Sequence, residues 1–183
     1  MQLSTISPRR AIGAAAIAFA AALVPVAALA ATSSATSRPA STPACATSGL
    51  VIWFAPQVGG GYAGGYYYNI NFTNLSGHAC TLRGYPGVSA VSLTGHQIGS
   101  PAGWGINPGT KVHTITLAEG ATARAQLNVG DPGKWSQCSP FPTAAGLRVY
   151  PPGQRASKVV PYPLGACGHT GVVWMGAGPV QDN

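Results

Sequence analysis

The sequence predicts an all-β fold, an antiparallel immunoglobulin-like β-sandwich, with a small barrel as the alternative. Several segments alternate apolar and polar residues with a period of two, and Gly- and Pro-rich turns separate them. After residue 30, no segment carries apolar residues at helical spacing over three turns. Four cysteines in a chain of 183 residues suit two disulfides. We therefore expect about seven to nine short strands around one disulfide-linked core.

The first thirty residues predict a signal peptide. Arg9 and Arg10 form a basic head, an uncharged apolar run covers residues 11–29, and Ala28-Leu29-Ala30 matches a peptidase site. A membrane helix is disfavoured because the run contains Pro25 and ends in a cleavage pattern. The residues after the paired arginines differ from a twin-arginine signal, so ordinary secretion is favoured. We expect an extracellular protein, free or associated with the cell wall, without a membrane span in the mature form.

Residues 31–44 are rich in Ser, Thr, Pro and Ala, which predicts a flexible linker before a single domain at 45–183. Charged residues make up only 7% of the chain, and the net charge of +7 includes two arginines of the signal peptide. The other basic residues are scattered, whereas nucleic-acid binding needs a basic stripe. We expect no nucleic-acid partner, and at most a mild attraction to anionic cell-wall polymers.

The clearest predicted strand covers residues 66–74. Tyr66, Tyr68, Ile70 and Phe72 fall on one face, and residues 67, 69, 71 and 73 fall on the other, as in a half-buried antiparallel strand. The neighbouring segments predict a buried strand at 50–54, a freely bending loop at Gly59–Gly65, and strands at 80–83 and 88–93. We assign four aromatic residues to the core: Trp53, Tyr66, Tyr68 and Trp174.

A second predicted hairpin joins residues 113–117 to residues 121–129. Ile115 and Leu117 face inward, Glu119-Gly120 supplies the turn, and alternate residues from Ala121 to Val129 return to the core. Asp131-Pro132-Gly133 predicts a further turn, because Asp bonds forward, Pro presets φ and Gly tolerates a positive φ. The last predicted strands lie at 147–150, 158–160 and 171–175.

Four cysteines follow the predicted signal peptide: Cys45, Cys80, Cys138 and Cys167. An even number in an exported protein predicts two disulfides, and the wide spacing disfavours a zinc knuckle. Three connectivities are possible, of which we favour the pairing of sequence neighbours, Cys45–Cys80 and Cys138–Cys167.

These residues carry a resemblance to a known family. The run Phe72-Thr-Asn-Leu-Ser-Gly-His-Ala-Cys80-Thr-Leu-Arg-Gly-Tyr-Pro86-Gly-Val, the segment from Leu117 and the segment Gly146-Leu-Arg-Val-Tyr-Pro-Pro152 resemble an exported actinobacterial family, domain of unknown function 4232. The resemblance spans nearly all of residues 45–180. It implies an exported all-β domain of uncharacterised function, free or attached to the envelope, and it supplies no catalytic residue.

The sequence does not predict catalysis, a metal or a cofactor. The three carboxylic side chains, Glu119, Asp131 and Asp182, lie in predicted turns or beside the terminus, where they do not form a glycosidase pair. No Gly-x-Ser-x-Gly elbow supports a serine nucleophile. The alternative is a secreted hydrolase or a metal-dependent enzyme, which would use the scattered histidines, His78, His96, His113 and His169.

Four aromatic residues form the candidate binding surface: Trp104, Trp135, Tyr62 and Tyr67. Both tryptophans are predicted to lie in loops. Flat rings with polar tips suit contact with sugars or peptides, although such residues also cap the open ends of a β core. We expect a secreted, non-catalytic binding or structural module of the cell envelope or extracellular medium. Its expected partner is a cell-wall polymer, a polysaccharide or an envelope protein.

Overall fold

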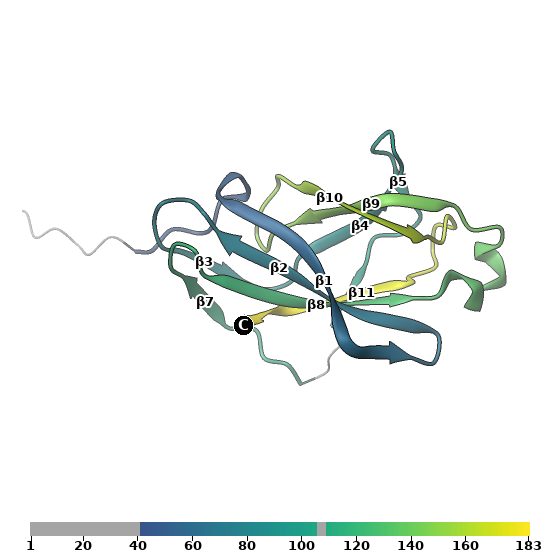
Figure 1. The fold of residues 1–183 in the computed structure, drawn as a ribbon, viewed down its shortest axis with the longest axis horizontal. Coiled ribbons are helices and arrows are strands. Elements are labelled where there is room, and N and C mark those ends of the chain that lie inside the picture. The colour runs from purple at the N-terminus through teal and green to yellow at the C-terminus, as the bar shows by residue number, and fades with distance from the viewer. Residues whose placement is uncertain (1–40, 106–108) are drawn as a thin grey trace, which may run out of the picture. The chain divides into compact units, whose positions relative to one another are not determined.

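A computed structural model describes residues 41–105 and 109–183, and these residues form an all-β domain (Figure 1). Helical structure in this part of the chain is confined to three 3₁₀ turns, η1 (Thr47–Gly49), η2 (Pro132–Lys134) and η3 (Ser136–Cys138). The strands are β1 (Leu50–Tyr62), β2 (Gly65–Asn74), β3 (Cys80–Arg83), β4 (Gly87–Val91), β5 (Gln97–Ile98), β6 (Gly103–Trp104), β7 (Thr114–Leu117), β8 (Thr122–Gly130), β9 (Thr143–Tyr150), β10 (Lys158–Gly165) and β11 (Met175–Asp182). The predicted signal peptide lies outside the described residues, as does the linker up to residue 40.

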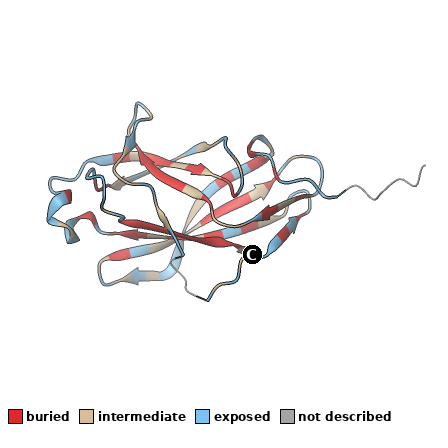
Figure 2. Ribbon diagram, turned by 180° about the vertical axis from the view of Figure 1, so that it is seen from behind, coloured by how far each residue is buried: buried red, intermediate tan, exposed pale blue. Residues whose placement is uncertain are grey.

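The strands form three sheets. The largest has the order β1-β2-β8-β11-β6, the second has the order β10-β9-β4-β5, and β3 pairs with β7. Buried residues of all three sheets belong to one hydrophobic cluster, and Figure 2 shows them along both larger sheets. No helix among the described residues has the length and apolarity that a membrane crossing requires.

The central strands of the five-stranded sheet confirm the predicted alternation. Ile70 and Phe72 of β2 and Leu127 of β8 are all 0% exposed. Residues 123, 125, 127 and 129 of β8 are buried, whereas residues 122, 124, 126 and 128 are not. This sheet therefore has an inner face toward the core and an outer face toward solvent, and we use these two names below.

Two of the aromatic residues assigned to the core are exposed instead. Trp53 is 44% exposed because β1 buries Leu50 and Ile52, which leaves Val51 and Trp53 on the outer face. Tyr66 is 61% exposed, because it is the second residue of β2 and the buried part of that face begins only farther along the strand, at Ile70. The assignments of Trp174 and Tyr68 are confirmed: Trp174 is 2% exposed, and Tyr68 is partly buried against the core.

The predicted hairpin of residues 113–117 and 121–129 is wrong in its pairing. Both strands form, but β7 pairs with β3, while β8 pairs with β2 and β11. The reason is burial, because the β3–β7 register places Leu117 beside Cys80 and Ile115 beside Leu82, all buried in the core. The turn at Gly120, with φ of 78°, therefore carries the chain from one sheet to another.

The predicted loop at Gly59–Gly65 is also wrong. β1 continues to Tyr62 and β2 begins at Gly65, so only Ala63 and Gly64 lie between the strands. The register shifts between Pro56 and Gly61, and such a bulge accommodates residues that normally weaken a strand.

The last strand begins later than predicted. The expected strand at 171–175 is absent, and β11 instead runs from Met175 through Gly178-Pro179 to Asp182. A second register shift, between Ala177 and Val180, lets Pro179 sit inside a strand that pairs with β8 on one side. The Asp131-Pro132-Gly133 turn forms as predicted, since the Asp131 carboxylate accepts a hydrogen bond from Gly133 N at 2.9 Å.

The favoured disulfide pairing is confirmed. Cys45 is joined to Cys80, and Cys138 is joined to Cys167. The first bond anchors the segment before η1 to β3, where Cys45 N donates to Thr81 O at 2.9 Å and Thr81 N donates to Pro43 O at 2.8 Å. The second joins η3 to the segment after β10.

Candidate functional site

The outer face of β8 forms the floor of the candidate site. Arg124, Gln126, Asn128 and Gly130 alternate with buried residues, so they share this face. The β2 register places Asn69 beside Gln126 and Tyr67 beside Asn128. On the other side, the β11 register places Gln181 beside Arg124 and Gly176 beside Asn128. Three adjacent strands thus present amides, a phenol and a guanidinium to the same side of the sheet.

Aromatic residues lie at one end of this face. The Tyr62 hydroxyl donates to Asn128 Oδ1 at 2.5 Å, and the ring centroids of Tyr62 and Tyr67 are 4.9 Å apart. A Cβ atom added to Gly130 would lie 2.8 Å from the Trp135 ring, so the indole lies over this glycine. Glycine is required here because any side chain would displace the indole.

A cleft of about 370 Å³ opens among these residues, and we call it the aromatic cleft. Its lining residues are Tyr62, Gly103, Trp104, Gly105, Asn128, Gly130, Lys134, Trp135, Val173, Trp174, Met175 and Gly176. The Trp174 indole N–H is buried and has no hydrogen-bond partner within the described residues, so the cleft is lined by a residue with an unsatisfied donor.

Trp104 lies at the rim of the aromatic cleft, on the two-residue strand β6 rather than in the predicted loop. Its ring is stacked on Tyr85 at 5.8 Å between centroids, and its Nε1 donates to Pro86 O at 3.2 Å. β6 places Trp104 beside Ala177, whose side chain is in the core, so the indole leaves the sheet on its inner side. The ring is nevertheless 67% exposed, because β6 is the edge strand.

A second cleft of about 450 Å³ lies farther along the same face, and we call it the polar cleft. It is lined by Pro56, Gln57, Val58, Asn69, Thr110, Arg124, Gln126, Pro179 and Gln181. Gln126 Nε2 donates to Gln57 Oε1 at 2.8 Å, which ties β8 to the twisted part of β1. The sequence does not predict this cleft, because outward amides at alternate positions are typical of any solvent-facing strand.

The structure therefore brings three of the four candidate binding residues together. Tyr62, Tyr67 and Trp135 surround Asn128 and Gly130 on the outer face, and Trp104 contributes to the rim.

The comparisons with known proteins identify the family. A family model described as Domain of unknown function (DUF4232) matches residues 45–181. The chain belongs to this family. The match confirms the domain family that the sequence resembles, and it covers both disulfides and both clefts of the DUF4232 domain. No curated protein and no solved structure matches the chain.

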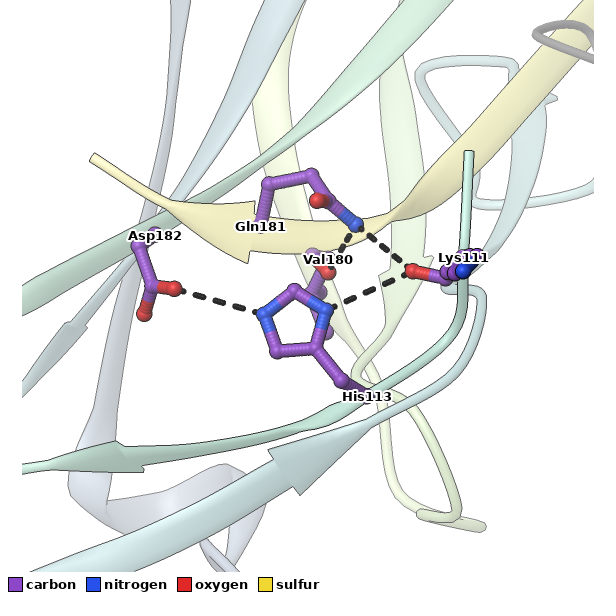
Figure 3. A network of polar contacts seen from close by, with 5 residues as sticks. All are labelled: Lys111, His113, Val180, Gln181 and Asp182. Carbon is purple, nitrogen blue, oxygen red and sulfur yellow. Dashed lines mark hydrogen bonds and ion pairs between the residues drawn. The ribbon is translucent and has the colours of Figure 1, made fainter. Parts of the chain in front are cut away.

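One histidine of the DUF4232 domain lies near a carboxylate. His113 Nε2 is 3.3 Å from Asp182 Oδ2, and His113 Nδ1 is 3.4 Å from Lys111 O (Figure 3). Gln181 Nε2 donates to the same Lys111 carbonyl at 3.5 Å and to Val180 O at 2.7 Å. The side chains of His113 and Asp182 are 45% and 75% exposed, and neither lines the aromatic or the polar cleft.

The other three histidines, His78, His96 and His169, are exposed. His78 Nδ1 lies 3.0 Å from Ser76 O, a contact within its own turn. Within residues 41–105 and 109–183, no three His, Cys, Asp or Glu side chains are grouped closely enough to hold a metal ion.

A third cleft, of about 270 Å³, contains Tyr66, Tyr68 and Phe141, and we call it the tyrosine cleft. Burial, together with the hydroxyl of Tyr162, raises the pKa of Tyr68 to about 12 from the ordinary 10.0. Because the folded protein holds this phenol protonated, the stability linked to Tyr68 is present below pH 10 and is lost as the pH rises toward 12.

Replacing Tyr68 with Phe should reduce this alkaline loss, because the variant has no phenol to ionise at that position. We would measure urea unfolding of both proteins at about pH 9 and about pH 12. The matched control Tyr66→Phe removes an exposed hydroxyl from the same strand and should retain most of the parent's loss. Equal alkaline loss in the parent and the Tyr68→Phe variant would contradict the assignment.

Proposed function

We propose that this DUF4232 domain is an exported actinobacterial binding module without catalytic activity. Its proposed ligand is a polymer of the cell envelope or of the surrounding medium. The arrangement of the two clefts carries the proposal: rings and amides from β1, β2, β8 and the segment after β8 converge on one face of a sheet. The signal-peptide pattern and two disulfides favour an oxidising compartment outside the cytoplasm.

The proposal includes an immunoglobulin-like β-sandwich as the fold. The two larger sheets contribute to one hydrophobic core, and nearly all their pairings are antiparallel, with β11–β6 as a parallel exception. Each sheet has two different edge strands, β1 and β6 in one and β10 and β5 in the other. Open edges favour a sandwich over the small barrel, because a barrel closes its sheet on itself.

The aromatic cleft suits a ligand with flat apolar faces and hydroxyl groups. Tyr62 is held by Asn128 and by the Tyr67 ring, and Trp104 is held by Tyr85 and Pro86. Side chains already fixed before binding lose little conformational entropy when a ligand arrives. Sugar rings have the required combination of an apolar face and polar edges, and they fit beside the amides of the polar cleft.

The rival proposal is an enzyme that uses the His113–Asp182 pair. The 3.3 Å contact favours it, since an imidazole beside a carboxylate can act as a base. Both side chains are substantially exposed, and neither lines the aromatic or the polar cleft. A hydrolytic activity that disappears in His113→Ala and persists in Trp135→Ala would favour the enzyme.

The test of the binding proposal is adsorption of the purified protein to insoluble envelope material. The Trp104→Ala/Trp135→Ala variant should bind about tenfold more weakly, because aromatic anchors carry much of the affinity at such sites. Tyr66→Ala is the matched control, since it removes an exposed ring from the inner face of β2. Circular dichroism of each variant checks folding. Equal adsorption by the parent and the double variant would refute the proposal.

A further inference from the structure

We propose that the two clefts form one continuous groove along the outer face of β8 and that the groove binds an acidic linear polysaccharide. In this arrangement Arg124 and Lys134 contact the negative groups of the polymer, and the aromatic cleft accepts its sugar rings. The inference rests on the proposed function and narrows its ligand to one chemical class.

The continuity of the groove follows from the strand register. Gln126 lines the polar cleft, and Asn128 lines the aromatic cleft. They lie two positions apart on the same face of β8, which separates them by about 7 Å along the strand. The outward row from Arg124 to Gly130 extends over about 20 Å. A floor of this length suits several units of an extended chain better than a single small molecule.

Both charged residues that line the groove are basic. Arg124 lines the polar cleft, Lys134 lines the aromatic cleft, and neither set of lining residues contains Asp or Glu. Both side chains are exposed, and neither forms an ion pair within the described part of the chain. Lys134 Nζ lies 5.8 Å from the centre of the Trp135 ring, which places the ammonium group beside an aromatic surface.

The chain has only three acidic side chains, and none of them lines the aromatic or the polar cleft. Glu119 accepts from Gly77 N at 2.7 Å, and Asp182 lies against His113. Asp131 is close to Lys134 in sequence, but its carboxylate accepts from Gly133 N, and the residue lines the tyrosine cleft. No carboxylate therefore lines the groove itself, and its two basic side chains favour an anionic ligand.

The lining also argues against a simple polyanion. Nucleic acids and polyphosphates are held mainly by rows of Lys and Arg, whereas this groove offers one such residue in each cleft. Asn69, Gln126 and Gln181 line the polar cleft with Arg124, and amide groups of this kind can pair with sugar hydroxyls. Acidic groups spaced along a chain of sugar rings match this alternation of charge, amide and aromatic surface.

The test compares polygalacturonate with its methyl ester, which has the same sugar chain without the charge, and with polyphosphate, which has charge without sugar rings. Binding of the full chain is measured for each polymer at about 0.05 M and about 0.5 M salt. The Arg124→Gln/Lys134→Gln variant is compared with Arg83→Gln/Arg155→Gln, which removes the same charge from exposed positions outside both clefts.

We expect the parent to bind polygalacturonate more tightly than either other polymer, and to lose affinity at the higher salt concentration. The groove variant should lose about tenfold in affinity, and the control variant should lose little. Equal binding of the methyl ester or of polyphosphate would overturn the inference, as would equal losses in both variants. If none of the three polymers binds while adsorption to envelope material persists, the inference fails and the proposed function survives. If the protein also fails to adsorb to envelope material, both the inference and the proposed function are refuted.

Discussion

Replacing Asn74 with Ala should lower the free energy of unfolding by about 3 to 5 kcal/mol. Asn74 is 0% exposed at the end of β2. Its Nδ2 donates to the carbonyls of His78 at 2.8 Å, Leu117 at 3.0 Å and Ala118 at 3.2 Å. Its Oδ1 accepts from Ser76 N at 3.1 Å and from Ser76 Oγ at 2.7 Å. One side chain thus joins three segments, and its removal leaves several buried polar groups unpaired.

The matched control for Asn74 is Asn71→Ala. Asn71 lies on the same strand and is only 4% exposed, but its amide makes a single long contact to Asn69 O at 3.4 Å. Urea unfolding measures both variants. Asn71→Ala should lower the free energy of unfolding by only about 1 kcal/mol. Similar losses in the two variants would contradict the role given to the Asn74 amide.

Replacing Cys138 and Cys167 with Ala should lower the free energy of unfolding by about 3 to 4 kcal/mol on the chain-entropy model. The bond closes a separation of 29 residues, and Cys138 and Cys167 are 2% and 0% exposed. The Cys45/Cys80 pair, with a separation of 35 residues, should cost a similar amount. Urea unfolding of each double variant measures the loss.

Thiol titration of the native protein tests the two disulfides directly. Under denaturing, non-reducing conditions we expect no reactive thiol, because all four cysteines are paired. Four titrating thiols would contradict both disulfides and the proposal of an exported protein.

The parts of the fold that depend on local pattern could be predicted from the sequence. The alternation in residues 66–74 and 121–129 places Ile70, Phe72 and Leu127 in the core, and the structure confirms this burial. The partner of β7 could not be predicted, because the choice between β8 and β3 depends on contacts between residues far apart in sequence. The extension of β1 past Pro56 and of β11 past Pro179 could not be predicted either, since bulges accommodate prolines that a regular ladder would exclude.

The candidate site could be predicted only in part. The sequence marked Tyr62, Tyr67 and Trp135 by their chemistry. The β1–β2 and β2–β8 registers bring the two tyrosines to one face, and the segment after β8 places the Trp135 ring against Gly130. The polar cleft left no recognisable sequence signal, because Asn69 and Gln126 look like ordinary outward residues. That Arg124 and Lys134 line clefts without a carboxylate likewise emerges only from the structure.

The most direct measurement is the change in backbone amide chemical shifts when a solubilised envelope polysaccharide is added to the labelled protein. We expect the largest changes at Tyr67, Gln126, Asn128, Gly130 and Trp135. The first four lie on the outer face of β2 and β8, and the Trp135 ring lies over Gly130. Changes concentrated instead at the tyrosine cleft, or on β4, β9 and β10, would contradict a binding groove on this face.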